Sequence, residues 1–390
     1  MNESLDIYVS RCINCGFCDA VCPTLEAADF RGYFGARGRV NLAKELIKND
    51  IGEEEVLDSF NSCLHCNACL YVCPAGISAG EISEKLKLRS SKKDPLAKFI
   101  AENIMKYKDP LNIGKGSTLW SKGLKFNEQS EYLFYTARMY QLMPYNSAVA
   151  KMREKLGEGL LKKFSPTFSK LGFKGSLLKI FLEREKVKEF NNILLNIYKV
   201  LAESGVELRY LGEEEPYSGA MLLEFGFEKE FTSYANWLVN FFKSKNIKKI
   251  VTIDPHTYTL LKYQIKDYVN FPFEVIFYLD LVNKKANFSG TVTIHQACHL
   301  ERYGEKYRKY YDILSDVRII NPIHFNERTF CCGGPDEVLF PNLTNKISEK
   351  RFIELKSTEA DYIITMCPIC YINLKKDEKV IDISQFIAKF

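Results

Sequence analysis

The sequence predicts an α+β multidomain protein, in which a helical N-terminal module precedes duplicated α/β domains with mostly parallel sheets. Three observations predict this fold. Two cysteine runs of equal spacing lie within residues 1–85, short apolar runs alternate with helical patterns from about residue 131, and one stretch of that region recurs further along it. Strands that alternate with helices indicate βαβ units. With 390 residues and 46% apolar content, the chain is long enough to form several packed domains.

The first module, residues 1–85, is organised around eight cysteines. They form the runs Cys12-x2-Cys15-x2-Cys18-x3-Cys22-Pro23 and Cys63-x2-Cys66-x2-Cys69-x3-Cys73-Pro74. This is the ligand spacing of bacterial two-cluster ferredoxins, in which three cysteines of a run bind one [4Fe–4S] cubane and the fourth binds the neighbouring one. We therefore assign Cys12, Cys15, Cys18 and Cys73 to one cluster, and Cys63, Cys66, Cys69 and Cys22 to the other. Structural zinc also uses C-x2-C pairs, but it does not explain the third and fourth cysteines or the prolines.

Two helices are predicted between the cysteine runs. Residues 39–48 have an amphipathic pattern, and residues 53–60 begin with three glutamates, which the helix dipole favours in a first turn. Arg37 and Arg39 precede or begin the first helix, where they either offset the negative charge of a reduced cluster or are ordinary surface arginines. Residues 86–130 are charged and irregular, with Pro95 and Pro110 as breakers, and are interpreted as a helical linker.

The rest of the chain is predicted to form two α/β domains, residues 131–285 and 286–390. The candidate strands are 131–135, 206–210, 249–253, 273–278, 291–295, 317–320 and 362–366. Residues 250–262 align with residues 363–375 and share Ile, Thr, Pro, Tyr, Leu and Lys, which indicates a duplication. Asp254 and Thr257 of the first copy then correspond to Cys367 and Cys370 of the second, and residues 217–219 correspond to residues 331–333. The first copy is therefore expected to keep the frame without the cysteines.

The second copy contains the remaining five cysteines. Cys298 and Cys367-x2-Cys370 follow predicted strands, and Cys331-Cys332 precedes two glycines, which allow close backbone approach. Since the carboxyl ends of parallel strands line the binding crevice of an open sheet, these groups are expected to converge on one site.

This pattern resembles the cysteine-rich CCG domain shared by heterodisulfide reductase subunits and the iron–sulfur subunits of glycolate, lactate and glycerol-3-phosphate dehydrogenases. The order of a two-cluster ferredoxin module, a helical linker and tandem CCG domains is similar too, and the Gly35-Ala-Arg-Gly-Arg39 element resembles the SPRGR element of the glycolate oxidase type. The resemblance covers about residues 8–80 and 131–390. It implies a non-cubane [4Fe–4S] cluster, with candidate ligands, and possible catalytic residues, Cys298, Cys331, Cys332, Cys367 and Cys370.

Several alternatives stay open at this site. The heterodisulfide reductase active site uses two intact motifs, whereas the first copy here has none, which counts against disulfide cleavage by a pair of clusters. Besides an iron–sulfur cluster, the site could hold zinc through four of the five cysteines. The third alternative is a set of packed cysteines without a metal. His295 and His256 are placed near strand ends at the expected crevice, and His65 and His299 adjoin cluster cysteines. Each of these histidines alone is more often structural than functional.

Composition and charge restrict the partners. A net charge of +5 gives little support for nucleic-acid binding, and the thirteen cysteines in metal-type spacings indicate a reducing compartment. Neither a signal sequence nor a membrane span is recognised, so the protein is expected in the cytoplasm, or peripherally on the cytoplasmic membrane face. Residues 151–188 are rich in Lys and Arg interleaved with Phe and Leu. They are either a docking surface for a membrane or an acidic partner, or a solvated helical face over a core stripe.

The sequence thus predicts an iron–sulfur electron-transfer subunit of an oxidoreductase complex. Cubane clusters carry single electrons, and no glycine-rich nucleotide fingerprint is found, so we expect no flavin or nicotinamide bound by the chain itself. By the resemblance, the partner is a flavoprotein dehydrogenase acting on a 2-hydroxy acid or glycerol-3-phosphate, or another redox subunit. The alternatives are a heterodisulfide reductase-type catalytic subunit and a zinc-bearing docking module with a redox-active ferredoxin domain.

Overall fold

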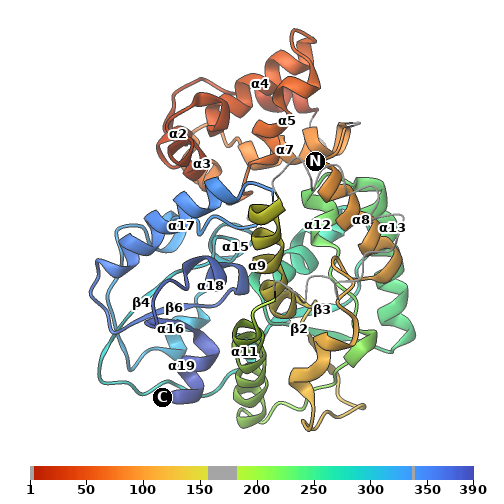
Figure 1. Cartoon of the computed structure of the whole chain (residues 1–390), viewed down its shortest axis with the longest axis vertical. Helices are drawn as coiled ribbons and strands as arrows, with labels where there is room; N and C mark the ends of the chain where they lie inside the picture. Colours follow the sequence, from red (N-terminus) through yellow and green to blue (C-terminus); the bar gives the residue numbers. More distant parts are fainter. Residues whose placement is uncertain (1–3, 91, 157–181, 336–338) are drawn as a thin grey trace.

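The computed structural model of the protein describes residues 4–90, 92–156, 182–335 and 339–390. Its N-terminal part is a small helical module that caps one end of the molecule (Figure 1). The elements of this module are α1 (Leu5–Ser10), α2 (Phe17–Ala20), α3 (Pro23–Ala27), η1 (Gly32–Phe34), α4 (Ala36–Lys48), α5 (Glu53–Asn61), α6 (Ala68–Val72) and α7 (Ala79–Arg89). Helices α4, α5 and α7 pack around a small core that includes Val40, Phe60 and Ile82. The two helices expected between the cysteine runs are therefore α4 and α5.

The stretch interpreted as a linker forms α8 (Pro95–Tyr107) and the 3-10 helix η2 (Gly114–Ser121). Asp94 caps α8 by accepting from the backbone N–H of Leu96 at 2.8 Å, and Pro95 occupies the first helical position, where no N–H is needed. Helix α8 packs against α12 (Ala220–Glu224) and α13 (Glu228–Ser244). Its apolar side is therefore part of the large core that also fills both α/β domains.

The first α/β domain is built on the three-stranded parallel sheet β1-β2-β3. Its strands are β1 (Tyr132–Tyr135), β2 (Lys249–Thr252) and β3 (Glu274–Phe277), and its remaining elements are α9 (Met139–Leu156), α11 (Arg184–Glu203), η4 (Gly212–Glu214), α14 (Pro255–Thr259), η5 (Leu260–Gln264), η6 (Ile265–Asp267) and η7 (Tyr278–Leu281). Three successive residues of both β1 and β2 are buried, as expected for a sheet covered on both faces. The predicted strand at 206–210 is wrong in extent, because only a parallel bridge between Arg209 and Leu133 forms there.

The second α/β domain contains the parallel sheet β5-β4-β6-β7. Its strands are β4 (Thr291–Ile294), β5 (Arg318–Ile319), β6 (Tyr362–Thr365) and β7 (Val380–Asp382), and its helices are α15 (Cys298–Arg302), α16 (Lys309–Ile313), η8 (Asn326–Arg328), α17 (Pro341–Lys356), α18 (Pro368–Leu374) and α19 (Ile383–Lys389). Strand β7 was not predicted from the sequence. The structure is thus mixed α and β with two small parallel sheets, as predicted.

The two sheets have the same plan. In the first, the bridge at Arg209 lies beside β1, β1 beside β2, and β2 beside β3, which matches the order β5-β4-β6-β7 of the second. Gly219 and Gly333, which correspond in the sequence alignment, have nearly equal positive φ angles of 91° and 94°. A left-handed backbone at this position favours glycine, so both copies keep the same turn. These shared features support the duplication.

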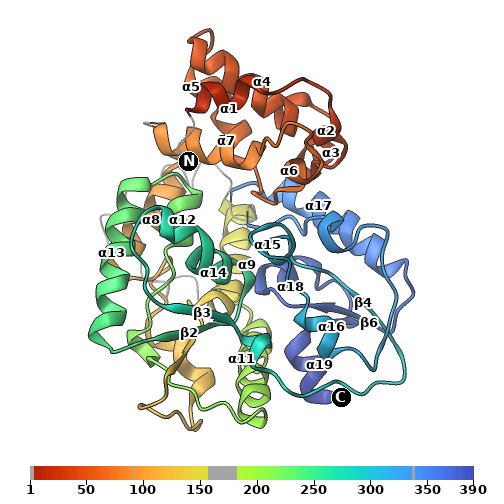
Figure 2. The same ribbon diagram turned by 180° about the vertical axis from the view of Figure 1, so that it is seen from behind.

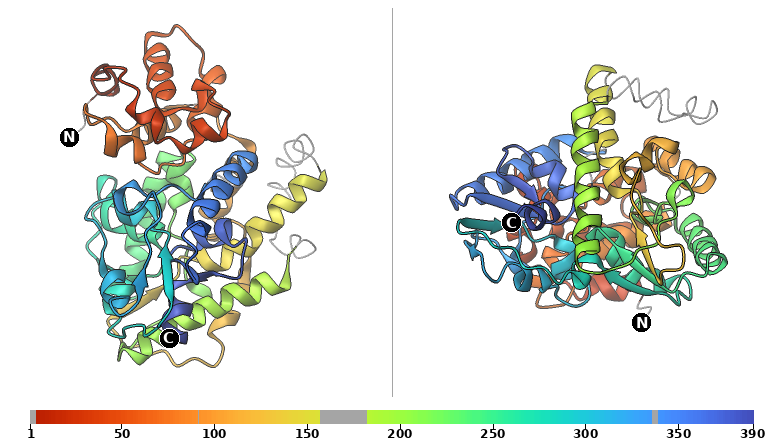
Figure 3. Two further views of the ribbon diagram at one scale, coloured as in Figure 1. Left: turned by 90° about the vertical axis from the view of Figure 1, so that its left-hand side faces the viewer. Right: turned by 90° about the horizontal axis from the view of Figure 1, so that it is seen from below.

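The two α/β domains pack closely together. Helix α11 lies against α19, and α9 lies against α18 (Figure 2, Figure 3). Tyr140 of α9 donates to Asp382 at 3.1 Å, and the rings of Phe190 and Tyr371 meet edge to face with centroids 5.7 Å apart. Of the basic stretch 151–188, residues 157–181 lie outside the described residues.

Candidate functional site

The first cysteine run forms a loop around a cavity in the N-terminal module. Cys12, Cys15 and Cys18 line this cavity together with Cys73 of the second run. Cys15 is exposed and the other three are half-buried. Cys69 of the second run lines the cavity as well, so the lining contains the four cysteines assigned to one cluster and one assigned to the other. Several sulfurs around one cavity suit a cubane, and the assignment of ligands to each cluster stays a prediction.

The second run repeats the backbone of the first. Asn14 and Gly16 have positive φ angles, and so do the corresponding residues His65 and Asn67. Asn, Gly and His are the residue types that most readily adopt this left-handed conformation. Both runs therefore turn in the same way around the centre that their cysteines enclose.

The second group of sulfurs lies deeper than the first. Cys63, Cys66 and Cys69 are buried. Burial, together with the neighbouring sulfurs of Cys66, Cys63 and Cys22, raises the pKa of Cys69 to about 12. Cys22 of the first run lies close to Cys69, as does Cys18, so the crossed assignment of Cys22 to the second cluster stays a prediction.

Arg39 lies against this second group rather than on the surface. Its side chain is buried, and its Nη1 donates to the Cys22 sulfur at 3.8 Å and to Thr24 Oγ1 at 3.0 Å. Its Nε donates to the Ser59 carbonyl at 2.7 Å. Arg37, in contrast, is half exposed and forms an ion pair with Asp19 at 2.9 Å. Arg39 therefore places a buried positive charge beside Cys22, and Arg37 lines the cavity of the first cysteine group, so both arginines lie near cluster cysteines.

The five remaining cysteines gather at the carboxyl ends of β4 and β6. Cys298 begins α15, Cys367 caps α18 and Cys370 lies in its first turn. Hydrogen-bonding contacts connect the sulfurs in the order Cys298, Cys331, Cys332, Cys370 and Cys367. Convergence of the three sequence groups is therefore observed, and we call these five residues the CCG cysteines.

Cys332 lies at the centre of the CCG cysteines. Hydrogen bonds from Cys331 and Cys370 hold the pKa of Cys332 well below its usual value, and the imidazole of His295 contributes in the same direction. The same contacts raise the pKa values of Cys331 and Cys370. The chemistry of the site therefore suits a soft metal or an iron–sulfur cluster, which binds thiolates.

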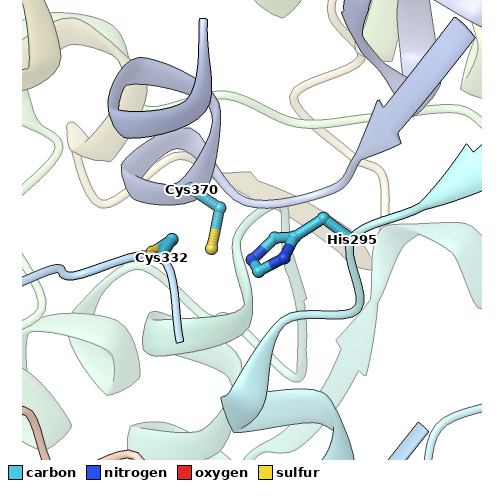
Figure 4. Close-up of side chains that lie close together, drawn as sticks. All are labelled: His295, Cys332 and Cys370. Carbon is cyan, nitrogen blue, oxygen red and sulfur yellow. The ribbon is translucent and has the colours of Figure 1, made fainter. Parts of the chain in front are cut away.

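His295 faces these sulfurs, as Figure 4 shows. Its ring, Cys332 and Cys370 offer three potential ligand atoms that all lie within 4.8 Å of one another. His295 Nδ1 accepts a hydrogen bond from Nε of Arg351 at 3.1 Å, and both side chains are buried. The sequence placed His295 near a strand end, but Arg351 was missed, because it lies 56 residues away in α17 and carries no local motif.

The first copy has no cysteine at the corresponding positions. Leu133 pairs with Ile250, and Thr293 pairs with Ile363. Because Ile250 and Ile363 correspond in the sequence alignment, Leu133 and Thr293 have equivalent places in the two sheets. Five residues further on, Arg138 takes the place of Cys298. The places of the other four are taken by Tyr217, Ser218, Asp254 and Thr257, all buried. Asp254 instead caps α14, accepting from the Thr257 N–H at 2.8 Å.

The second cysteine run and the CCG cysteines are in direct contact. A hydrogen bond from Cys331 lowers the pKa of Cys66 to about 6, and both residues belong to one buried apolar cluster. Arg302 donates from Nη1 to the Cys66 carbonyl at 2.7 Å and from Nε to the Glu327 carbonyl at 2.9 Å. Tyr303 donates to the His65 carbonyl. The sequence did not identify this junction, because its two sides are more than 200 residues apart.

Comparison with known proteins identifies both modules. Residues 8–77 match the 4Fe-4S dicluster domain, and residues 292–375 match the cysteine-rich CCG domain. One subunit of the dihydromethanophenazine:CoB–CoM heterodisulfide reductase of Methanosarcina mazei is 22% identical over 430 residues, covering 98% of this chain and 93% of that protein. The probable glycolate oxidase iron–sulfur subunit of Bacillus subtilis is 22% identical over 403 residues, covering 94% and 88%.

A third relative is matched over less of its length. The probable iron–sulfur-binding oxidoreductase FadF of Bacillus subtilis is 29% identical over 192 residues, covering 46% of this chain and 27% of FadF. These comparisons confirm the resemblance inferred from the sequence and imply [4Fe–4S] clusters in the N-terminal module. In the part of the chain that the structure describes, no helix is both long enough and apolar enough to span a membrane.

Proposed function

We propose that the chain is the iron–sulfur electron-transfer subunit of an oxidoreductase complex, in which two cubanes carry single electrons between a partner protein and a third cluster at the CCG cysteines. The observation that carries this proposal is the spatial order of the sulfurs. Cys15 of the first group is exposed, Cys66 of the second group is buried, and Cys66 touches Cys331. Clusters in series with one exposed end and one enclosed end form a wire for electrons.

The exposed end suits a redox partner. Ile13 and Phe17 flank Cys15 and are 69% and 59% exposed, which places two large apolar side chains beside the first cubane. Exposed apolar groups next to a redox centre are suited to transient docking. The partner we propose is a flavoprotein dehydrogenase acting on a 2-hydroxy acid or glycerol-3-phosphate, and the similarity to the probable glycolate oxidase iron–sulfur subunit supports it.

A second candidate is reduction of a thiol disulfide at the CCG cysteines. Its support is the similarity to the heterodisulfide reductase relative over 98% of the chain. Against it stands the first copy, in which Arg138, Ser218 and Asp254 occupy places that cysteines hold in the second. One CCG site could still bind a single thiol.

An anaerobic metal count with electron paramagnetic resonance (EPR) tests the cofactors. Two cubanes and a CCG cluster require about twelve irons per chain, whereas about eight irons and one zinc would show a zinc-bearing docking module. We expect Cys332→Ser to lose only the CCG signal and Cys18→Ser only a cubane signal. Loss of all signals in Cys332→Ser would contradict separate sites.

Purification of the tagged chain from its source organism tests the partner. We expect a flavin-containing chain to co-purify, and the substrate of that flavoprotein to reduce the cubanes before the CCG cluster. Absence of any flavoprotein, together with oxidation of the clusters by a disulfide substrate, would favour the second candidate.

A further inference from the structure

The feature that carries a further inference is the imidazole of His295, at the carboxyl end of β4. Its side chain is 1% exposed, and it points into the group of sulfurs rather than into the core (Figure 4). Among the described residues, its Nε2 atom has no hydrogen bond of good geometry, although the Cys332 sulfur lies close enough to interact with the ring. A buried polar atom without a partner is costly, so Nε2 is placed for a group that the site receives.

Arg351 determines which nitrogen of this ring carries the proton. Its Nε donates to His295 Nδ1 at 3.1 Å, and a guanidinium is always charged and has only donors. The nitrogen that accepts from it must therefore be unprotonated. In a neutral imidazole the proton is then on Nε2, so the edge that faces Cys332 and Cys370 can donate a hydrogen bond but has no free lone pair.

Arg351 is itself held rigidly in this position. It is fully buried, donates from Nη1 to the His324 carbonyl at 2.9 Å, and pairs with Glu354 at 2.8 Å. A rotation that released His295 Nδ1 would break these bonds in a dry environment, where an unpaired polar group is costly. The tautomer is therefore set by the fold and not by the ligand.

From this geometry we infer that His295 is not a metal ligand of the CCG site, although it lies within ligand distance, but the Nε2–H donor of a hydrogen bond to a sulfur of the bound group, with Arg351 as its positioning residue. The inference rests on the proposed CCG cluster. Hydrogen bonds to cluster sulfurs stabilise the more negative, reduced state and raise its potential. His295 therefore makes this cluster a better acceptor of electrons from the buried cubane.

Two substitutions of similar polarity test this inference. In His295→Asn, the amide oxygen can replace Nδ1 as the acceptor for Arg351, but no donor reaches the position of Nε2. In His295→Gln, the amide nitrogen can replace the Nε2–H donor. We expect both holoproteins to retain the full iron and sulfide content. The midpoint potential of the CCG cluster, from an EPR-monitored redox titration, should fall in His295→Asn and stay closer to wild type in His295→Gln.

Pulsed EPR of protein labelled with ¹⁵N-histidine provides a direct readout. A hydrogen-bonded imidazole gives a weak nitrogen coupling, and a metal-bound one gives a strong coupling. A strong coupling, loss of the cluster in both variants, or equal potentials in both variants would each overturn the inference. If the wild-type site binds zinc, the proposal of a cluster at the CCG cysteines is wrong. Retention of zinc in both variants would still support the inference that His295 is not a metal ligand. Loss of zinc in both variants would refute that inference.

Discussion

Glu215 is the residue whose environment most clearly distinguishes the first copy from the second. Its carboxylate is buried and accepts from the Thr136 N–H at 3.0 Å and from the Thr136 hydroxyl. The corresponding pair in the second copy is Thr329 and Gln296, joined by a neutral hydrogen bond of 2.9 Å. The first copy thus holds an ionisable group where the second holds none.

This burial predicts a pH dependence of stability. Burial raises the pKa of Glu215 from 4.5 to about 7, so the folded state keeps a proton that the unfolded state loses. The contribution of Glu215 is therefore fully present below about pH 4.5 and is lost as pH rises to about 7, where the free energy of unfolding is lower by about 3 kcal/mol. The stability of Glu215→Gln relative to wild type should increase through this range, as measured by anaerobic calorimetry. The surface variant Glu203→Gln is the control, and parallel pH curves for Glu215→Gln and wild type would contradict the prediction.

At the scale of elements, the cysteine loops depend on how closely α4 approaches η1. A Cβ atom on Gly38 would lie 1.8 Å from the Gly32 carbonyl oxygen, so only glycine fits there. Gly32 itself has no heavy atom near the place of a Cβ and has an ordinary φ. Helix α4 carries Arg39, which reaches Cys22, and a shift of this helix would move that charge away from the sulfurs.

Gly38→Ala should therefore destabilise the N-terminal module by about 1–3 kcal/mol, the usual cost of overpacking. We expect it to accelerate the loss of visible cluster absorbance on heating, with the cluster for which we propose Cys22 as a ligand lost first. Gly32→Ala adds the same methyl group six residues earlier in the chain and should behave like wild type. Equal rates of cluster loss in the two variants would refute the close-approach argument.

These elements also show what the sequence could predict. The spacing of cysteines and the pattern of apolar residues are local properties of the sequence. The cysteine runs, helices α4 and α5, and six of the strands could therefore be located from them. Residues 206–210 have a strand-like sequence but form only one bridge, at the edge of the sheet beside β1. Arg351 and Arg302 were beyond prediction, because their partners lie 56 and 236 residues away in the chain, and only the fold brings them together.

At the scale of the whole molecule, the N-terminal module is attached to the second α/β domain at two kinds of contact. The inner contact is made by Arg302, whose guanidinium donates hydrogen bonds to the backbone carbonyls of Cys66, Glu327 and Thr329. The outer one consists of two surface ion pairs, Lys346 with Asp29 at 2.9 Å and Lys350 with Glu26. Both contacts connect the same two modules. Substitutions at the two contacts therefore distinguish a specific effect on the junction between Cys66 and Cys331 from a general weakening of the attachment between the modules.

Arg302→Met should weaken the inner contact severely, because it removes charged hydrogen bonds worth about 1.5–3 kcal/mol each and frees the loop before Cys331 from Cys66. Lys346→Met should cost less than about 1 kcal/mol, as exposed ion pairs do. After rapid reduction of the cubanes, freeze-quench EPR should show slower appearance of the reduced CCG cluster in Arg302→Met, with cubane reduction unchanged. Lys346→Met should match wild type, since Cys66 and Cys331 stay in contact. If Arg302→Met transferred electrons at the wild-type rate, the contact between Cys66 and Cys331 would not be the route, and electrons would have to reach the CCG cysteines from another side of the site.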